Sequence, residues 1–354
     1  MTTTDPPYGA ILLVSFGGPE APDEVLPFLR NVTRGRDVPD ARLEEVGRHY
    51  RRFGGRSPIN DHNRALATAL EAELAGAGIH LPVVLGNRNW HPFLAETLAD
   101  LGDRGVRRAL AVVTSAYSSY SGCRQYREDV ARARAGVGDG APEVDKVRVF
   151  YNHPGFVAAQ ADRVREALDE LDAEVRDDVR LVFTTHAIPR TMSRHSDYEV
   201  QTYEACRLVV EALGIPYAWD LVFNSRSGPP AVPWLEPDVN DHLEALAGDG
   251  CRTVVVVPIG FVSDHMEVIY DLDVEAAATA ERLGMTFVRV GTVGTHPRFV
   301  TGLRELVEER VRDAPRLALG TRGPSWDACP LDCCLTPGQE RLPAIADAPA
   351  ARSR

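Results

Sequence analysis

The run of four valines at 254–257, closed by Pro258, restricts the fold of this chain more than any other feature. An unbroken apolar, β-branched run is typical of a strand that is buried on both faces, as in a parallel sheet. The loop Ile259–Ser263 follows, and an amphipathic run begins at Asp264. Strand, short loop and helix in this order predict a βα unit of an α/β fold.

Three carboxylates recur at four-residue intervals along the predicted helix, at Glu267, Asp271 and Glu275. In an α-helix this spacing keeps them in one row, with a drift of about 40° per step. The row begins where the strand ends, at the edge where α/β sheets bind ligands, so it would suit a cation or proton transfer. From spacing alone, a solvated helix face opposite apolar residues is the more common interpretation.

The alternation of strand and helix extends along most of the chain. We expect strands at 11–15, 83–85, 110–114, 147–151, 181–185, 221–224, 254–257 and 286–290. Two successive series without hairpin patterns predict an α/β fold of two similar, doubly wound, Rossmann-like parallel-sheet domains with a cleft between them. We place these domains at 1–146 and 147–313, with the glycine-rich segment 136–142 as linker and a cysteine-containing, otherwise flexible tail at 314–354.

The chain is acidic, with 51 acidic and 39 basic side chains and a formal net charge of -12 at pH 7. This charge argues against a nucleic-acid-binding protein and against adsorption on an anionic membrane. The apolar run 11–16 is too short for a signal peptide or a membrane span, so we expect a cytoplasmic protein without a transmembrane segment. Lys146 is the only lysine, which is typical of GC-rich codon usage rather than of a functional choice.

Two segments have the composition of a binding surface. The segment 48–57 is the most basic of the chain and contains interleaved aromatic residues, which suit carboxylates and a flat ring. The loop 115–126 contains three tyrosines after a predicted strand. A solvated basic turn and tyrosines at a domain surface are the alternative interpretations.

His186 and Glu267 both lie at or just beyond the end of a predicted strand. If these strands are neighbours, the two side chains converge. A neutral imidazole and a carboxylate suit a divalent iron with open positions, although either group could instead accept protons, and a strand-end histidine often only donates a structural hydrogen bond. With the acid row, the basic segment and the tyrosine loop, they describe a site for a metal ion, a flat ring and carboxylates.

The chain resembles the ferrochelatases, which insert ferrous iron into a porphyrin in the last stages of haem synthesis. The resemblance covers about residues 11–311 and is carried by the ordered motifs Leu13–Pro19, Gly54–Pro58, Phe183–Pro189, Ser225–Pro229 with Pro233–Leu235, and Pro258–Glu267. It implies a chelatase-like fold with His186 and Glu267 as the metal-site pair. The positions that it implies for porphyrin contacts are Ser57, Tyr126, Phe16, His49 and Tyr50.

The resemblance also implies the reaction. Iron replaces two pyrrole N–H protons, so Fe(2+) is a substrate and no organic cofactor is needed. His186 would bind iron or accept the first proton, and Glu267 would bind iron. Asp271 and Glu275 would form a path for iron or protons.

The sequence looks most like the actinobacterial members, which are thought to use coproporphyrin III, and Arg48, Arg51, Arg52 and Arg56 could meet its propionates. Protoporphyrin IX is the alternative substrate, and a corrin-pathway cobalt chelatase is a more remote relative. A porphyrin or haem carrier without turnover would share the pocket but would not need the acid row. The product would pass to a downstream haem-synthesis enzyme.

Three cysteines crowd the tail, at Cys329, Cys333 and Cys334, and fit iron-sulfur or zinc ligation. Some ferrochelatases carry a 2Fe-2S cluster on three C-terminal cysteines and one upstream. This chain has a different C-terminal spacing and no cysteine near Ala159, where the upstream ligand is expected. We choose Cys123 as the fourth ligand because a helix start favours a thiolate.

Overall fold

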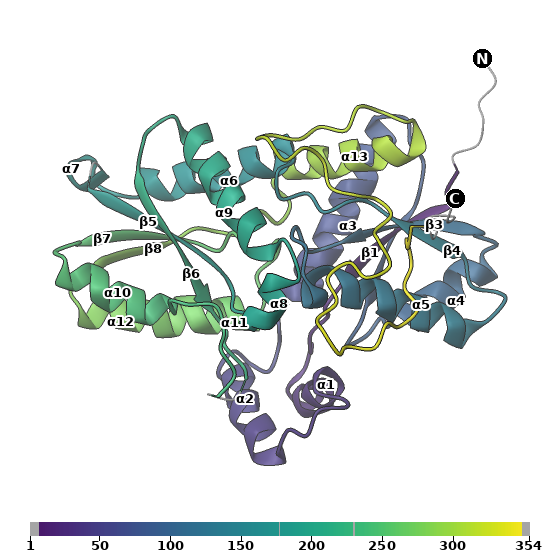
Figure 1. Ribbon diagram of the computed structural model, residues 1–354, viewed down its shortest axis with the longest axis horizontal. Coiled ribbons are helices and arrows are strands. Elements are labelled where there is room, and N and C mark those ends of the chain that lie inside the picture. Colours follow the sequence, from purple (N-terminus) through teal and green to yellow (C-terminus); the bar gives the residue numbers. More distant parts are fainter. Residues whose placement is uncertain (1–6, 177, 229–230, 349–354) are drawn as a thin grey trace.

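The computed structural model describes residues 7–176, 178–228 and 231–348. Two four-stranded, fully parallel sheets form its centre, in the orders β2-β1-β3-β4 and β6-β5-β7-β8 (Figure 1). The strands are β1 Ala10–Ser15, β2 Val83–Asn87, β3 Arg108–Val113, β4 Glu143–Lys146, β5 Val179–His186, β6 Ala218–Asn224, β7 Thr253–Val257 and β8 Thr286–Arg289. The prediction of two doubly wound parallel-sheet units is confirmed.

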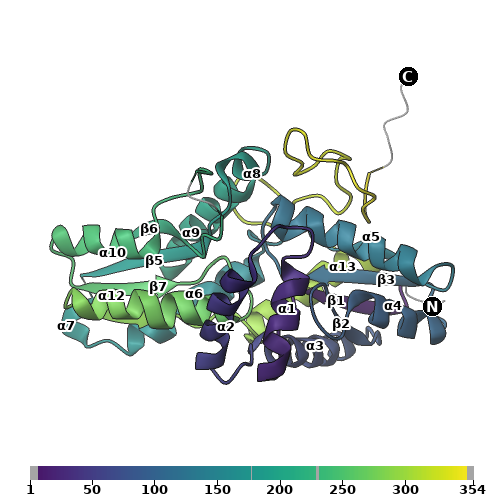
Figure 2. The same cartoon turned by 90° about the horizontal axis from the view of Figure 1, so that it is seen from below.

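Helices cover both faces of each sheet (Figures 1 and 2). The α-helices are α1 Val25–Val32, α2 Asp40–Arg52, α3 Ile59–Gly76, α4 Leu94–Asp103, α5 Gln125–Val137, α6 Pro154–Asp169, α7 Ala173–Arg176, α8 Arg190–Arg194, α9 Tyr198–Leu213, α10 Val239–Gly248, α11 Met266–Val268, α12 Ala277–Arg282 and α13 Pro297–Val311. A 3-10 turn, η1, spans Pro22–Glu24, and two π-helical segments span Tyr120–Arg124 (η2) and Ile269–Ala276 (η3).

The valine run forms β7, which lies between β5 and β8 and is buried along its whole length. Val255 and Val257 pack into the core that β5 shares with α6, α9 and α13. Val254 and Val256 face the opposite core, formed with α10, α11 and α12. Burial on both faces explains why no polar residue alternates with the valines.

The predicted strand at 147–151 is wrong. The fourth strand of the first sheet is Glu143–Lys146, and it pairs with β3 at the sheet edge. The segment 147–151, apolar except for the buried Arg148, instead leaves the sheet and enters the core, where the backbone N–H groups of Phe150 and Tyr151 donate to the carbonyl of Ala116. The segment 147–151 is largely apolar because it is buried beneath helices. The edge strand, in contrast, has charged side chains at Glu143, Asp145 and Lys146.

The two units share one continuous core, and helix α13 packs against both α6 and α3. Polar contacts also cross between them. Tyr117 Oη donates to the carbonyl of Ile259 (2.9 Å), and Ser263 Oγ donates to Asn63 Oδ1 (3.2 Å). The domain boundary near residue 146 therefore stays a prediction, because packing alone does not divide the chain there.

Helices α1 and α2 form a pair that projects beside the junction of the two units (Figures 1 and 2). Phe28 of α1 and Tyr50 of α2 share a buried cluster with Met266 of α11. This cluster joins the projecting pair to the start of the helix that carries the acid row.

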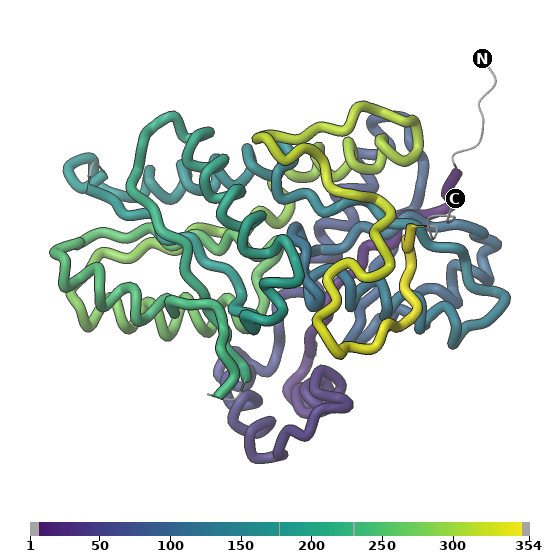
Figure 3. The backbone as a smooth tube through the Cα atoms, in the orientation of Figure 1, coloured from purple at the N-terminus to yellow at the C-terminus, as the bar shows by residue number. Residues whose placement is uncertain are grey.

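The C-terminal tail runs over α5 (Figure 3). Two fully buried arginines hold it. Arg124 donates to the carbonyls of Leu331 (2.8 Å) and Cys333 (3.1 Å), and Arg127 donates to that of Ile345 (2.9 Å). The tail is thus attached by backbone carbonyls as well as by its cysteines. In the described parts of the chain, none of the helices is long and apolar enough to span a lipid bilayer.

Candidate metal and porphyrin site

His186 is the last residue of β5, directly beside Asn224 at the end of β6. Tyr198 of α9 fixes this strand end, because its hydroxyl donates to the His186 carbonyl (2.9 Å). His186 Nδ1 lies 2.5 Å from the carbonyl oxygen of Ala187. Since a carbonyl only accepts, Nδ1 carries the proton and the lone pair of the neutral ring is on Nε2.

Glu267 lies beside that lone pair, with its Oε2 3.6 Å from His186 Nε2. Two atoms at this separation can both bind one first-row divalent ion at about 2.1 Å. About half of the Glu267 side chain is exposed (52%), yet desolvation by the surrounding protein raises its pKa, with Asp271 adding to the rise and His186 opposing it. The structure therefore brings the predicted pair together.

A close backbone contact sets the loop that leads to Glu267. The N–H of Gly260 donates to the carbonyl of Thr184 (3.1 Å), and a Cβ at residue 260 would lie 2.2 Å from Thr185 Oγ1. Only glycine fits this approach of the loop to β5. This close contact explains why the motif Pro258–Glu267 has a glycine at position 260.

Most of the acid row lies on a π-helix rather than on the predicted α-helix, and the helical segment begins at Met266 instead of Asp264. Glu267 belongs to the short turn α11, whereas Asp271 and Glu275 belong to η3. Bonds from residue i to i+5 widen the turn, so the drift calculated for an α-helix does not apply. Such segments occur frequently at functional sites.

Asp271 is held by the end of β6. Its Oδ2 accepts hydrogen bonds from Asn224 Nδ2 (3.2 Å) and from Ser225 Oγ. Burial raises the pKa of Asp271, and these two donors oppose the rise. Ser225 has a φ of 62°, a left-handed conformation that is costly for a residue other than glycine and is common at functional sites.

Glu275 continues the row. Its pKa is raised by desolvation, and the charges of Asp271 and Asp238 add to that rise. The three carboxylates of the row therefore share a tendency to hold protons, which a bound cation would reverse.

Two ring residues at the row were missed by sequence reasoning. Tyr270 of η3 stacks on His49 of α2, with ring centroids 3.8 Å apart and planes inclined by 6°. His265 precedes Met266, and burial together with the nearby His186 lowers its pKa to about 3, so it is neutral. His265 lies within the motif Pro258–Glu267 and Tyr270 directly precedes Asp271, so nearness in sequence was the available signal.

A half-buried arginine was missed as well. Arg289, at the end of β8, donates from Nη1 to Asp264 (3.0 Å) and from Nε and Nη2 to Asp273 (2.7 and 2.9 Å). It thus clamps the loop before Glu267 to the π-helix. No sequence pattern links residues 264, 273 and 289, because the contact depends on β8 lying beside β7.

The positions that the resemblance implied for porphyrin contacts fall into two groups. Tyr50 is buried against Phe28, with ring centroids 5.9 Å apart, and lies close enough to Glu267 for that charge to raise its pKa further after burial. His49 reaches the same helix through its stack on Tyr270. Both positions thus lie beside the His186–Glu267 pair.

Phe16 and Tyr126 both lie near Arg88, whose guanidinium is 5.7 and 4.8 Å from their ring centroids. Arg88 Nε is 2.7 Å from Asp129 Oδ2, and both side chains are buried. Ser57 is buried against Gly18, in the loop that follows β1 and Phe16. These three positions therefore surround the loop after β1.

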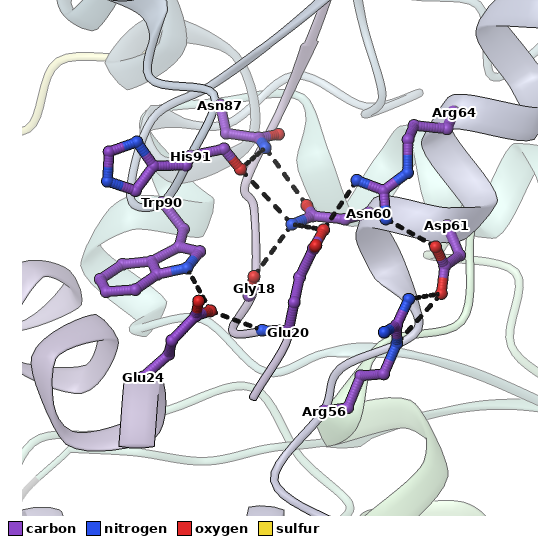
Figure 4. A network of polar contacts seen from close by, with 10 residues as sticks. All are labelled: Gly18, Glu20, Glu24, Arg56, Asn60, Asp61, Arg64, Asn87, Trp90 and His91. Atoms are coloured by element: carbon purple, nitrogen blue, oxygen red, sulfur yellow. Dashed lines mark hydrogen bonds and ion pairs between the residues drawn. The ribbon is translucent and has the colours of Figure 1, made fainter. Parts of the chain in front are cut away.

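A polar network fixes that loop (Figure 4). Asn60 Nδ2 donates to the carbonyl of Gly18 (3.0 Å) and to Glu20 Oε1 (2.9 Å), and Asn87 Nδ2 donates to Asn60 Oδ1 (3.2 Å). Trp90 Nε1 donates to Glu24 (2.7 Å). The loop is therefore held by α3 and by the turn after β2.

Four of the six cysteines gather between α5 and the tail. Cys329 contacts the thiols of Cys123 and Cys333, and these contacts, followed by the positive charges of Lys146 and Arg127, lower its pKa against the effect of burial. The sulfurs of Cys333 and Cys334 are 3.6 Å apart. Among the described residues, no three or more His, Cys, Asp or Glu side chains have the arrangement of a site for a single metal ion.

Two parallel-sheet units with a histidine and a row of carboxylates at the strand ends define a metal chelatase fold. SirB of Bacillus subtilis with Fe3+ covers 86% of this chain and 96% of its own, with a TM-score of 0.53 at 13% identity. The cobalt complex of the sirohydrochlorin chelatase SirB from Bacillus subtilis subspecies spizizenii covers 86% and 95%, with a TM-score of 0.50 at 12% identity. At these identities the likeness concerns the fold alone.

The chain belongs to the ferrochelatase family, whose model matches residues 8–311. The coproporphyrin III ferrochelatase of Streptomyces griseus is 50% identical over 97% of both chains. That of Frankia alni is 54% identical over 95% of this chain and 90% of its own. A ferrochelatase of Rhodopirellula baltica is 51% identical over 96% of this chain and 97% of its own.

Proposed function

We propose that this protein inserts Fe(2+) into coproporphyrin III and releases two protons, as a step of haem biosynthesis. The observation that carries the proposal is the approach of His186 Nε2 to Glu267 Oε2 at 3.6 Å, with Asp271 and Glu275 behind it. A carrier of porphyrin or haem would not need such a row. Coproporphyrin III ferrochelatases at 50–54% identity support the assignment.

The geometry suggests how the residues act. The bare Nε2 of His186 and the carboxylate of Glu267 would bind the entering iron and displace part of its water. Once the iron moves into the ring, the same two groups can take the pyrrole protons. Because its pKa is raised, Glu267 is better suited to accept a proton than a fully solvated carboxylate.

Asp271 and Glu275 would relay iron or protons between this pair and solvent. Their raised pKa values make both carboxylates better proton acceptors than fully solvated ones. Ser225 and Asn224 would keep Asp271 aimed at the relay through their hydrogen bonds.

The porphyrin would lie between the two groups of contact positions. His49 and Tyr50 border it on the side of the iron pair, and Phe16, Ser57 and Tyr126 border it on the side of the first sheet. Rings of this kind suit the flat face of a porphyrin. The projecting pair α1–α2 would then form one wall of the binding site.

Arg48 and Arg52, two exposed arginines of α2, are the best candidates to bind the propionates. Arg51 already pairs with Glu44 (3.0 Å), and Arg56 pairs with Asp61. Arg48 and Arg52 are exposed, and within the described parts of the chain neither forms an ion pair. We therefore assign propionate recognition to Arg48 and Arg52 before the other two.

Protoporphyrin IX is the second candidate substrate, because the relative from Rhodopirellula baltica at 51% identity is named only as a ferrochelatase. Anaerobic incubation of the pure protein with Fe(II) and each porphyrin separates the candidates. Faster metallation of coproporphyrin III is the expected result. Equal or faster use of protoporphyrin IX would overturn the substrate, and binding without metallation of either would favour a carrier.

We propose in addition that Cys123, Cys329, Cys333 and Cys334 hold a 2Fe-2S cluster. Each iron of such a cluster takes two protein sulfurs, so paired thiols are required rather than a single-ion site. The paired contacts of the four cysteines fit this arrangement. The cluster would supply a cross-link between α5 and the tail, since metal insertion itself transfers no electrons.

Cys206 and Cys251 serve as matched controls for the cluster. Cys206 is buried in α9, and Cys251 Sγ donates to the carbonyl of Thr253. Protein purified anaerobically should contain two iron and two sulfide ions per chain, and a Cys123→Ser change should remove them while Cys251→Ser does not. Colourless, iron-free wild-type protein would overturn the cluster.

The location and the handover remain part of the proposal. We infer a cytoplasmic enzyme that passes its product to a downstream haem-synthesis enzyme. Fractionation of cells that express the tagged full-length chain tests the first inference. Recovery of the chain in the membrane fraction would contradict it.

A further inference from the structure

Lys146, the last residue of β4, is almost fully buried, with 3% of its surface exposed. It is the single lysine among 39 basic residues, so the other 38 are arginines. Lysine places a compact, point-like cation here, whereas arginine would place a planar fork.

The ammonium group of Lys146 has an incomplete set of partners. Nζ donates to the carbonyls of Val147 (3.4 Å) and Trp326 (3.1 Å), so two of its three N–H bonds have an acceptor among the described residues. Among the described residues it forms no ion pair with a carboxylate. An uncompensated buried cation costs several kcal/mol, so an anion is required nearby.

The neighbouring buried arginines differ from Lys146 in having carboxylate partners. Arg124 pairs with Glu128 (2.7 Å), and Arg127 pairs with Asp347. The positive charge of each is therefore already balanced. Of these three buried cations, Lys146 is the one that has no carboxylate partner among the described residues.

The cysteine group lies within electrostatic reach of Lys146. Contact with Cys329 and burial raise the pKa of the Cys123 thiol, and the positive charge of Lys146 opposes this rise. The same charge contributes to the lowered pKa of Cys329. Trp326, which Lys146 holds by its carbonyl, is three residues before Cys329. The same side chain therefore faces both the upstream cysteine and the tail.

We infer that Lys146 is the counter-charge of an anionic iron-sulfur centre held by Cys123, Cys329, Cys333 and Cys334. This inference rests on the proposed cluster. Four thiolates and two sulfides outweigh the charge of two irons, and reduction adds a further negative charge. A fixed cation beside them stabilises the loaded site and favours its reduced form more than its oxidised form.

The test uses the full-length chain purified anaerobically, with two substitutions that remove the charge. Lys146→Gln keeps N–H donors for the two carbonyls, and Lys146→Met keeps only the length. The control is Arg104→Met, which removes one positive charge from an exposed pair of α4 with Asp100. Circular dichroism and porphyrin binding establish that each variant is folded. If Lys146→Met does not fold, the result for Lys146→Gln decides the test.

Iron and sulfide per chain, the rate of loss of visible absorption in a chelator, and the reduction potential are the readouts. Both Lys146 variants should lose the cluster at least tenfold faster, or shift the one-electron equilibrium tenfold toward the oxidised form, about 59 mV. Arg104→Met should match the wild type.

The outcomes distinguish the two proposals. Wild-type protein without iron or sulfide overturns the cluster and the role of Lys146 with it. A loaded wild type whose Lys146→Gln variant keeps its iron, chelator resistance and potential overturns the role of Lys146 alone. In that case hydrogen bonding to the two carbonyls would explain the buried lysine.

Discussion

The imidazole of His49 lies face to face with the phenol ring of Tyr270, with ring centroids 3.8 Å apart. His49 belongs to α2 of the projecting pair, whereas Tyr270 belongs to the π-helix that carries Asp271. The stack therefore links the wall of the proposed porphyrin site to the metal-site helix. Burial lowers the pKa of His49, so its ring is neutral at neutral pH.

Replacing Tyr270 by alanine should weaken porphyrin binding. A stacked aromatic pair contributes about 0.5–1.5 kcal/mol, so the Kd for the porphyrin should rise by up to about tenfold. Fluorescence quenching of the porphyrin measures it. Tyr270→Phe retains the stack and is the control. An unchanged Kd in Tyr270→Ala would mean that the stack does not shape the binding wall.

His186→Ala and Glu267→Gln should retain porphyrin binding and lose iron insertion. Loss of a positioned acid–base group costs about 10²–10⁴ in rate, and the loss of a metal ligand adds to this. Porphyrin titration and anaerobic insertion assays measure the two effects separately. Normal turnover by either variant would show that the pair is not the iron site.

Asp271→Asn should be slower than the wild type but more stable near neutral pH. The folded-state pKa of Asp271 is raised, so its contribution to stability is full below the unfolded value of about 3.9 and is lost as the pH rises through the folded value. Asparagine cannot ionise and avoids that loss. Urea unfolding at two pH values measures the difference, and a gain confined to acid pH would contradict the argument.

Ser225→Ala should move the acid limb of the pH–rate profile to higher pH. The Ser225 hydroxyl donates to Asp271 and opposes the rise in its pKa, so its removal raises that pKa further and protonates Asp271 earlier on acidification. Ser225→Gly also removes the hydroxyl but relieves the left-handed backbone. If only one of the two variants moves the limb, backbone strain rather than the hydrogen bond governs it.

The sequence was sufficient to predict the parallel-sheet units. A strand that is buried on both faces requires an unbroken apolar run, and Val254–Val257 is such a run. It also placed His186 at the end of a strand, whereas Glu267 lies in the turn α11 after the loop that follows β7. It did not reveal the π-helix, because a spacing of four residues fits an α-helix equally well. Nor did it reveal the edge strand at Glu143–Lys146, whose pairing depends on β3 rather than on its own residues.

Contacts between distant elements were the least predictable, and Arg289 is the clearest example. Its three hydrogen bonds join Asp264, before the metal-site turn, to Asp273 on the π-helix. Arg289→Met leaves both carboxylates without their partner. A fully buried pair would lose about 3–5 kcal/mol, but Asp273 is 35% exposed, so we expect about 2–3 kcal/mol after solvent screening.

The same change should raise the KM for Fe(II) while the Kd for the porphyrin stays near its wild-type value, because the clamp acts on the loop and helix that carry Glu267 and Asp271. Arg289→Lys keeps one charged contact and should recover part of both losses. Chemical unfolding and the iron dependence of insertion measure the two effects. If Arg289→Met loses stability but keeps its KM for iron, the clamp supports the fold without positioning the carboxylates.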